Sequence, residues 1–196
     1  MASGADDLLA RAKVYESLTA AISDCSLVVG ASARLRNLYC PIFDPRECAR
    51  HILGALPERK AAIVMGPEQS GLTNDDLGRC QFLVNIPTQA DYGSLNLAMA
   101  VQVLCYELRM AAIEHKPADR PRRESPPATA AELEGFHEHL ERVLSDSGFL
   151  NSDHPRKLKL RFRRMFQRAE LDQTEVNILR GVLSALDPAK SPSGRH

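Results

Sequence analysis

The feature that most restricts the fold is an alternation of short apolar runs with helical segments in the first 113 residues. Three runs, at 26–30, 61–65 and 82–86, are almost wholly apolar, as strands buried on both faces of a sheet are. The Asp-Pro-Arg-Glu segment at 44–47 predicts the start of a helix, and a longer helix is predicted over 94–112. This alternation predicts an α/β domain with a largely parallel sheet.

A proline- and charge-rich stretch at 114–128 divides the chain. It has almost nothing to bury, so we expect an exposed linker. Beyond it, capping boxes predict helix starts at Thr129 and Asp172, and apolar residues recur at helical spacing over 155–169. The predicted organisation is an α/β domain at 1–113, the linker at 114–128, a small helical bundle at 129–188 and a disordered tail at 189–196.

Composition excludes several classes of protein. Lysine plus arginine and aspartate plus glutamate both number 25, so the net charge does not indicate a partner. No run of about eighteen apolar residues is present, so no membrane span is expected. The 5 cysteines have no Cys-x-x-Cys spacing, and His137 and His139 fall on different faces of a helix. We therefore expect a reduced, cytoplasmic protein without a metal.

A glycine-containing loop follows the second apolar run. The segment from Gly66 to Thr73 has the spacing of a phosphate-binding P-loop, but Leu72 stands where the lysine belongs. Without that lysine, and with Glu68 in the loop, a nucleoside triphosphate would be poorly neutralised. Two alternatives stay open on spacing alone: a degenerate P-loop, or glycines that serve only tight turns.

A second motif follows the third apolar run. It comprises Asn85-Ile-Pro-Thr88 and then Asp91–Ala98, DYGSLNLA, at the expected start of the long helix. Such a start presents unpaired backbone N–H groups and short polar side chains to a ligand. Equally, Ser94-Leu95-Asn96 is a plausible helix cap with no further role.

Taken in order, these segments resemble the SPOUT methyltransferases of the SpoU/TrmH branch, over nearly the whole chain. The resemblance is carried by LVVGASARLR, DPRE, MGPEQSGL, NIPT, GSLNLAMAV and VLCYELRMA. The helical part, in GFHEHLERVL, GFLNSDHPRK and EVNILRGVL, resembles the C-terminal extension of the TrmJ group. The resemblance implies a parallel sheet tied into a trefoil knot, followed by a small C-terminal helical bundle. It also implies a homodimer that 2′-O-methylates a cytidine or uridine ribose in the tRNA anticodon loop.

Site residues follow from the resemblance, position by position. The implied cofactor is S-adenosylmethionine, which needs an apolar slot with backbone hydrogen bonds. The cofactor-binding positions are Ala31, Ser32, Ala33, Gly66, Ile86, Gly93, Ser94 and Leu95. Methyl transfer chiefly demands positioning, and the implied catalytic positions are Glu68, Ser94 and Asn96.

Basic residues concentrate in the helix predicted over 155–169, on the side away from its apolar stripe. The predicted RNA-binding residues are Arg34, Arg156, Lys157, Lys159, Arg161, Arg163 and Arg164, with Arg168 continuing the series. A helix with one apolar and one basic side suits contact with phosphates. For an isolated helix the alternative is a merely solvated face.

One family motif has no counterpart in the sequence. The family carries an Asn-x-Gly-x-x-x-Arg segment after an N-terminal strand, whose arginine is assigned to activation of the 2′-hydroxyl; the 196 residues contain no such segment. The resemblance therefore implies a catalytic domain without its N-terminal segment. The alternative function is a catalytically inactive RNA-binding or dimerising remnant of the same family.

Overall fold

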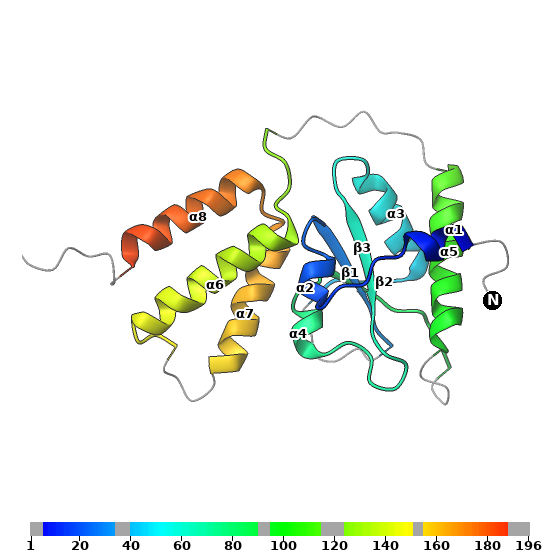
Figure 1. The fold of residues 1–196 in the computed structure, drawn as a ribbon, viewed down its shortest axis with the longest axis horizontal. Coiled ribbons are helices and arrows are strands. Elements are labelled where there is room, and N and C mark those ends of the chain that lie inside the picture. The colour runs from blue at the N-terminus through cyan, green and yellow to red at the C-terminus, as the bar shows by residue number, and fades with distance from the viewer. Residues whose placement is uncertain (1–5, 34–39, 90–94, 115–123, 151–154, 188–196) are drawn as a thin grey trace, which may run out of the picture.

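A four-stranded parallel sheet forms the centre of the molecule (Figure 1). The computed structural model describes residues 6–33, 40–89, 95–114, 124–150 and 155–187. The strands are β1 (Leu27–Ala31), β2 (Ile42–Phe43), β3 (Ala61–Met65) and β4 (Phe82–Val84), in the order β2-β4-β1-β3. All three pairings are parallel, which confirms the predicted class of sheet.

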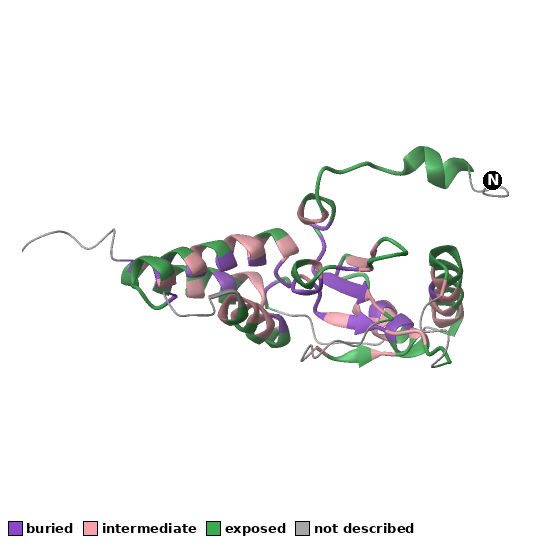
Figure 2. Cartoon of the chain, turned by 90° about the horizontal axis from the view of Figure 1, so that it is seen from below, coloured by how far each residue is buried: buried purple, intermediate pink, exposed green. Residues whose placement is uncertain are grey.

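Alternate residues of β1 point to the two faces of the sheet. Leu27 and Val29 are fully buried against helices α3 (Pro45–Ala55) and α5 (Leu97–Glu114). Val28 faces the other side, where α2 (Leu18–Ala21) and α4 (Asn74–Leu77) lie. Strand β1 is therefore covered on both faces, as its continuous apolar sequence predicts, and Figure 2 shows the buried strand at the centre of the sheet. Helix α1 (Asp6–Arg11) buries no residue and extends away from this core (Figure 2).

The predicted strand at 82–86 ends earlier than expected. Strand β4 stops at Val84, because Pro87 has no N–H to continue a ladder and the Asn85 side chain turns to another segment. Its amide Nδ2 donates a hydrogen bond to the Ser32 carbonyl oxygen at 2.9 Å. The backbone after β4 is thereby held beside the backbone after β1.

Three helices form the C-terminal bundle, as the sequence predicts. They are α6 (Ala130–Asp146), α7 (Pro155–Ala169) and α8 (Gln173–Leu186). The capping boxes at Thr129 and Asp172 are both present, so each first turn is satisfied by its own side chains. Phe136, 1% exposed, lies at the centre of the bundle and meets the edge of Phe166 at a ring-centroid distance of 4.7 Å.

The expectation of an exposed linker is wrong for its last residues. Ser125, Pro127 and Ala128 are buried, because this segment pairs with the turn between α7 and α8. The Ala128 N–H donates to the Leu171 carbonyl at 3.0 Å, and the Gln173 N–H donates to the Pro126 carbonyl at 3.0 Å. Residues 115–123 and the predicted tail lie outside the described residues.

The bundle rests on the segments that lead into the strands. The first two backbone N–H groups of α6, at Ala130 and Ala131, donate to the carbonyls of Cys25 and Ser23 at 2.7 and 3.1 Å. Arg59, just before β3, donates to the Ser26 carbonyl at 2.7 Å and pairs with a Glu170 carboxylate oxygen at 3.1 Å. The bundle is therefore bonded to the amino-terminal end of the sheet.

Candidate functional site

A pocket of about 500 Å³ opens at the opposite, carboxyl-terminal end of the sheet. The last residues of β1, β3 and β4 form its floor, and the segments after them form its walls. Of the predicted cofactor positions, it brings together Ala31, Ser32, Ala33, Gly66, Ile86 and Leu95. Among the described lining residues only Glu68 is charged. The rest of the lining consists of small and apolar side chains with a few uncharged polar ones.

The loop from Gly66 to Gly71 folds back on itself to make one wall. A Cβ at Gly66 would lie 2.5 Å from the Leu72 nitrogen and closer still to the Gly71 carbonyl carbon. Gly71 has φ of +65°, and its N–H donates to the Pro67 carbonyl at 2.8 Å. Both glycines therefore serve the tight turn, and the turn they permit is also the pocket wall.

Leu72 argues against the P-loop alternative. It is 7% exposed and belongs to the hydrophobic cluster on the α4 face of the sheet. The position that would hold a phosphate-binding lysine thus contributes to the core. A lysine at this position would bury its charge among apolar side chains, which is unfavourable.

The start of α5 is fixed to the pocket wall by Glu68. The Leu97 N–H donates to a Glu68 carboxylate oxygen at 3.0 Å, and the Ala98 N–H donates to the Asn96 side-chain oxygen at 2.9 Å. Glu68 lines the pocket and Asn96 does not. Asn96 therefore has the capping role that the sequence left open, and a catalytic role for either residue stays a prediction.

Sequence reasoning missed several residues in or beside the pocket. Asn85 lies beside it and holds the segments after β1 and β4 together, and its sequence signal is its place at the start of the Asn-Ile-Pro-Thr motif. Gln69, Ser70 and Thr88 line the pocket itself. Gly93, Ser94 and Arg34, together with the side chain of Arg156, lie outside the described residues.

The basic residues of α7 separate into two groups. Arg163 binds both carboxylate oxygens of Glu134 at 2.7 Å, and Lys159 binds Glu141 at 3.0 Å. The other group makes no ion pair within the described ranges and comprises Lys157, Arg161, Arg164 and Arg168. These four positions follow a spacing of four, three and four residues, which places them along one line of the helix. We call them the α7 basic stripe.

The described residues offer no metal site or membrane span. No group of three or more His, Cys, Asp or Glu side chains is placed to hold a metal ion in the part of the chain that the structure describes. None of the helices described here is both long and apolar enough to cross a membrane. The cysteines, all five within the described ranges, form no disulfide.

Comparisons with known proteins match both parts of the chain. Residues 1–106 match the SpoU rRNA methylase family, and residues 131–195 match the C-terminal domain of the tRNA methyltransferase TrmJ. The tRNA (cytidine/uridine/adenosine-2′-O-)-methyltransferase TrmJ of Pseudomonas aeruginosa is 48% identical over 192 residues, covering 93% of this chain and 75% of that protein. The tRNA (cytidine/uridine-2′-O-)-methyltransferase TrmJ of Yersinia pestis is 43% identical over 190 residues, covering 95% and 74%.

Solved structures agree with this match. The crystal structure of TrmJ from Z. mobilis superposes with a TM-score of 0.81 at 31% identity, covering 94% of this chain and 78% of that one. A probable methylase family protein from Haemophilus influenzae is 40% identical, with a TM-score of 0.55 and coverage of 95% and 77%.

Proposed function

We propose that this chain, which belongs to the SpoU rRNA methylase family and carries a TrmJ C-terminal domain, 2′-O-methylates tRNA with S-adenosylmethionine. The observation that carries the proposal is the pocket at the carboxyl ends of the parallel strands. Its lining unites six positions that the family resemblance implies for cofactor binding. Ligands bind at this end of open parallel sheets.

The described pocket residues fit S-adenosylmethionine. A volume of about 500 Å³ lies within the range of small-molecule sites. Ala31 and Ala33 leave room for an adenosine group, and the backbone at Gly66 and Ile86 offers hydrogen-bonding groups at the wall. When bound, the cofactor supplies a methyl group on a sulfonium, which reacts by displacement.

The chain's own residues shape and hold this pocket. Gly66 allows the loop to close on itself, and Glu68 fixes that loop to the first N–H group of α5. Ser94, on the segment leading into α5, is the proposed group beside the reacting ribose hydroxyl. We propose that Glu68 and Asn96 hold this segment in place, so that transfer is helped chiefly by positioning.

We propose tRNA as the substrate, with a pyrimidine ribose in the anticodon loop as the methylated group and the cytoplasm as the location. The names of both relatives specify 2′-O-methylation of cytidine and uridine in tRNA, and the name of the Pseudomonas aeruginosa relative adds adenosine. The α7 basic stripe is the proposed phosphate-contacting surface, because its cations lack ion-pair partners among the described residues. Arg163 and Lys159 are assigned instead to holding α7 against α6.

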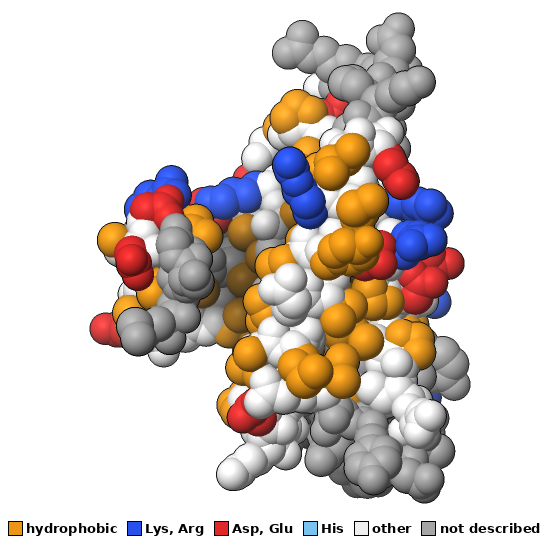
Figure 3. Space-filling view, turned by 90° about the vertical axis from the view of Figure 1, so that its right-hand side faces the viewer, with side chains coloured by type: hydrophobic (Ala, Val, Ile, Leu, Met, Phe, Trp, Pro, Cys, Tyr) orange, Lys and Arg blue, Asp and Glu red, His pale blue; other side chains and the backbone are white. Residues whose placement is uncertain are grey.

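The apolar face of α5 supports a homodimer. Of the 18 residues of α5 only Leu104 is buried, and Met99, Tyr106 and Ile113 are more than half exposed. Figure 3 shows hydrophobic side chains gathered over the face of the molecule that α5 forms. A second copy packed on this face would remove them from water. We expect sedimentation equilibrium to give twice the chain mass, and a monomer would contradict the dimer.

Two measurements on the 196-residue chain test the proposed activity. Calorimetry measures S-adenosylmethionine binding, and transfer of labelled methyl groups to an unmodified tRNA transcript measures catalysis. We expect binding, with the label in the ribose of an anticodon-loop pyrimidine. If the chain binds tRNA but neither binds the cofactor nor transfers label, the inactive RNA-binding alternative is correct and the proposal is wrong.

Salt dependence tests the RNA-binding surface separately. We expect Arg161→Gln and Arg164→Gln each to lower the slope of log affinity against log salt by roughly one, the loss of one phosphate contact. Lys159→Gln is the matched control on the same helix, because Lys159 is already paired with Glu141. If Arg161→Gln and Arg164→Gln keep the slope of the unaltered chain, the stripe is only a solvated face.

A further inference from the structure

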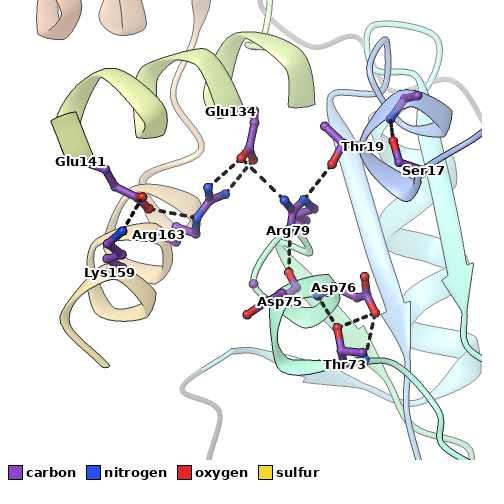
Figure 4. A network of polar contacts seen from close by, with 12 residues as sticks. Ser17, Thr19, Thr73, Asp75, Asp76, Arg79, Glu134, Glu141, Lys159 and Arg163 are labelled. Atoms are coloured by element: carbon purple, nitrogen blue, oxygen red, sulfur yellow. Dashed lines mark hydrogen bonds and ion pairs between the residues drawn. The ribbon is translucent and has the colours of Figure 1, made fainter. Parts of the chain in front are cut away.

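Three charged residues join the sheet domain to the bundle (Figure 4). Arg79 follows α4, Glu134 lies on α6, and Arg163 lies on α7. The Glu134 carboxylate accepts two hydrogen bonds from Arg163 at 2.7 Å and lies 3.6 Å from Nη2 of Arg79. One carboxylate therefore holds an arginine from each domain.

Arg79 is anchored on its own side by two further hydrogen bonds. Its Nε donates to the Thr19 hydroxyl at 3.1 Å, and its Nη1 donates to the Asp75 carbonyl at 2.9 Å. In Figure 4 the guanidinium points toward three different elements, and each of its three nitrogens, held in a planar fork, reaches one of them. A lysine at position 79 would keep the charge but lose this geometry.

The cluster is sheltered from solvent. The side chains of Arg163, Glu134 and Arg79 are 14%, 16% and 24% exposed. The hydrogen bonds from Arg163 hold the pKa of the Glu134 carboxyl below its usual value. Sheltered pairs of this kind contribute little net stability compared with apolar residues, but they fix one geometry, because a misplaced partner leaves a buried charge unpaired.

The geometry that the cluster fixes relates the pocket to the α7 basic stripe. The pocket loop ends at Leu72, α4 begins at Asn74, and Arg79 follows the end of α4. On the other side, Arg163 lies between Arg161 and Arg164 in α7. Both arginines contact the Glu134 carboxylate. The connection from the pocket loop to the stripe therefore passes through a single acidic side chain.

We propose that Arg79 and Glu134 are positioning residues for tRNA binding, holding α7 so that one tRNA engages the stripe and the pocket together. The proposal rests on the proposed function, because it requires the chain to bind tRNA. Neither residue contacts the RNA. Each acts through Arg163 and the helix that carries it. Two contact surfaces held on one rigid body bind a shared ligand more tightly than the same surfaces in variable orientation.

Substitution of Glu134 distinguishes positioning from simple electrostatics, because the two predict opposite changes in tRNA affinity. Glu134→Gln removes a negative charge beside a basic helix, so electrostatics alone predicts tighter binding of a polyanion. Positioning predicts weaker binding, by about tenfold, because two arginines then face a neutral amide and α7 loses the ion pairs that hold it in one orientation against α6 and the segment after α4. Fluorescence anisotropy with an unmodified tRNA transcript measures the change in affinity.

Glu141→Gln is the matched control. Glu141 is also an acid of α6 that pairs with cations of α7, but none of its described ion pairs reaches the sheet domain. We expect Glu141→Gln to bind tRNA as tightly as the unaltered chain, or more tightly. Arg79→Lys, which keeps the charge, should bind as weakly as Glu134→Gln. All variants are compared below their thermal transitions, and S-adenosylmethionine affinity should be unchanged in each.

The outcomes distinguish this inference from the proposed function. Weaker tRNA binding in Glu134→Gln and Arg79→Lys, but not in Glu141→Gln, supports it. If the unaltered chain binds tRNA and Glu134→Gln binds as well or better, the positioning role is wrong while the proposed function stands. Full binding by Arg79→Lys would also overturn it, because charge alone would suffice. If the unaltered chain does not bind tRNA, both proposals fail.

Discussion

The two ends of the sheet differ in the residues that build them. At the carboxyl end, small and apolar side chains surround the pocket, and only Glu68 is charged among its described residues. At the amino end, polar and charged side chains are buried where the bundle packs: Arg59, Gln81, His137 and Gln167 are all at most 7% exposed. One end leaves an open pocket, and the other is filled by polar and charged side chains of the chain itself.

This difference indicates which changes each end tolerates. The pocket depends on the backbone of a loop that touches itself, so an added atom there displaces main chain. The amino end, where the bundle packs and which we call the docking end, depends on interactions between buried polar side chains. Removal of one such group leaves another buried without compensation. We therefore expect steric substitutions to act at the pocket, and changes of charge or protonation to act at the bundle.

The largest expected effect is that of Gly66→Ala. Because its Cβ would overlap the backbone of Gly71 and Leu72, the pocket loop must move. We expect loss of detectable S-adenosylmethionine binding by calorimetry, and a free energy of unfolding lowered by about 1–3 kcal/mol. An unchanged affinity for the cofactor would show that this loop is not part of the binding site.

Acidification should act at the docking end. Burial, helped by nearby Arg163 and Arg79 and opposed by Glu134, lowers the pKa of His137 to about 4. The folded protein thus keeps His137 neutral, while the unfolded chain takes up a proton as the pH falls below about 6.5. Stability is therefore complete above that pH and falls toward pH 4 by roughly 1.4 kcal/mol per pH unit.

Urea unfolding at a series of pH values measures this loss, with His137→Gln as the comparison. The variant should lose most of the pH dependence between about 6.5 and 5. Glu134 does not contribute to the pH dependence of stability in this range. Its pKa is lowered, so its contribution is present above the ordinary carboxyl pKa and is lost only as the pH falls through the lowered value. Equal pH dependence in both proteins would assign the effect to other groups.

The smallest effect is expected at a position that belongs to neither end. Gly181 lies within α8, and an added Cβ would meet nothing within 4 Å. Gly181→Ala should raise the free energy of unfolding by about 0.5–1 kcal/mol, because alanine loses less backbone entropy in a helix. Thermal unfolding measures it. A destabilised variant would show that this surface of α8 is covered.

Local signals predicted much of the fold. The bounds of β3 and α7 match the predicted segments at 61–65 and 155–169, and three predicted helix starts are capped as expected. Each signal depends on residues a few positions apart. Strand β2 was missed because it is only Ile42 and Phe43, whose pairing with β4 no local pattern encodes.

The pocket positions were predicted from the family resemblance, and the fold gives the physical reason that they lie together. Ala31, Gly66 and Ile86 meet because parallel strands end at the same edge of a sheet. The division of the α7 cations could not be predicted. Arg163 and Arg164 are adjacent and chemically identical, and they differ because Glu134, 29 residues before Arg163 in sequence, lies on one side of the helix only.

The bonds at the start of α6 have an evolutionary consequence. Its first two N–H groups are satisfied by the main-chain oxygens of Cys25 and Ser23, which every amino acid possesses. Most side-chain substitutions at positions 23 and 25 therefore preserve these bonds. The attachment of the bundle can persist while the sequence at this junction drifts, and related proteins can share the arrangement without sharing the residues.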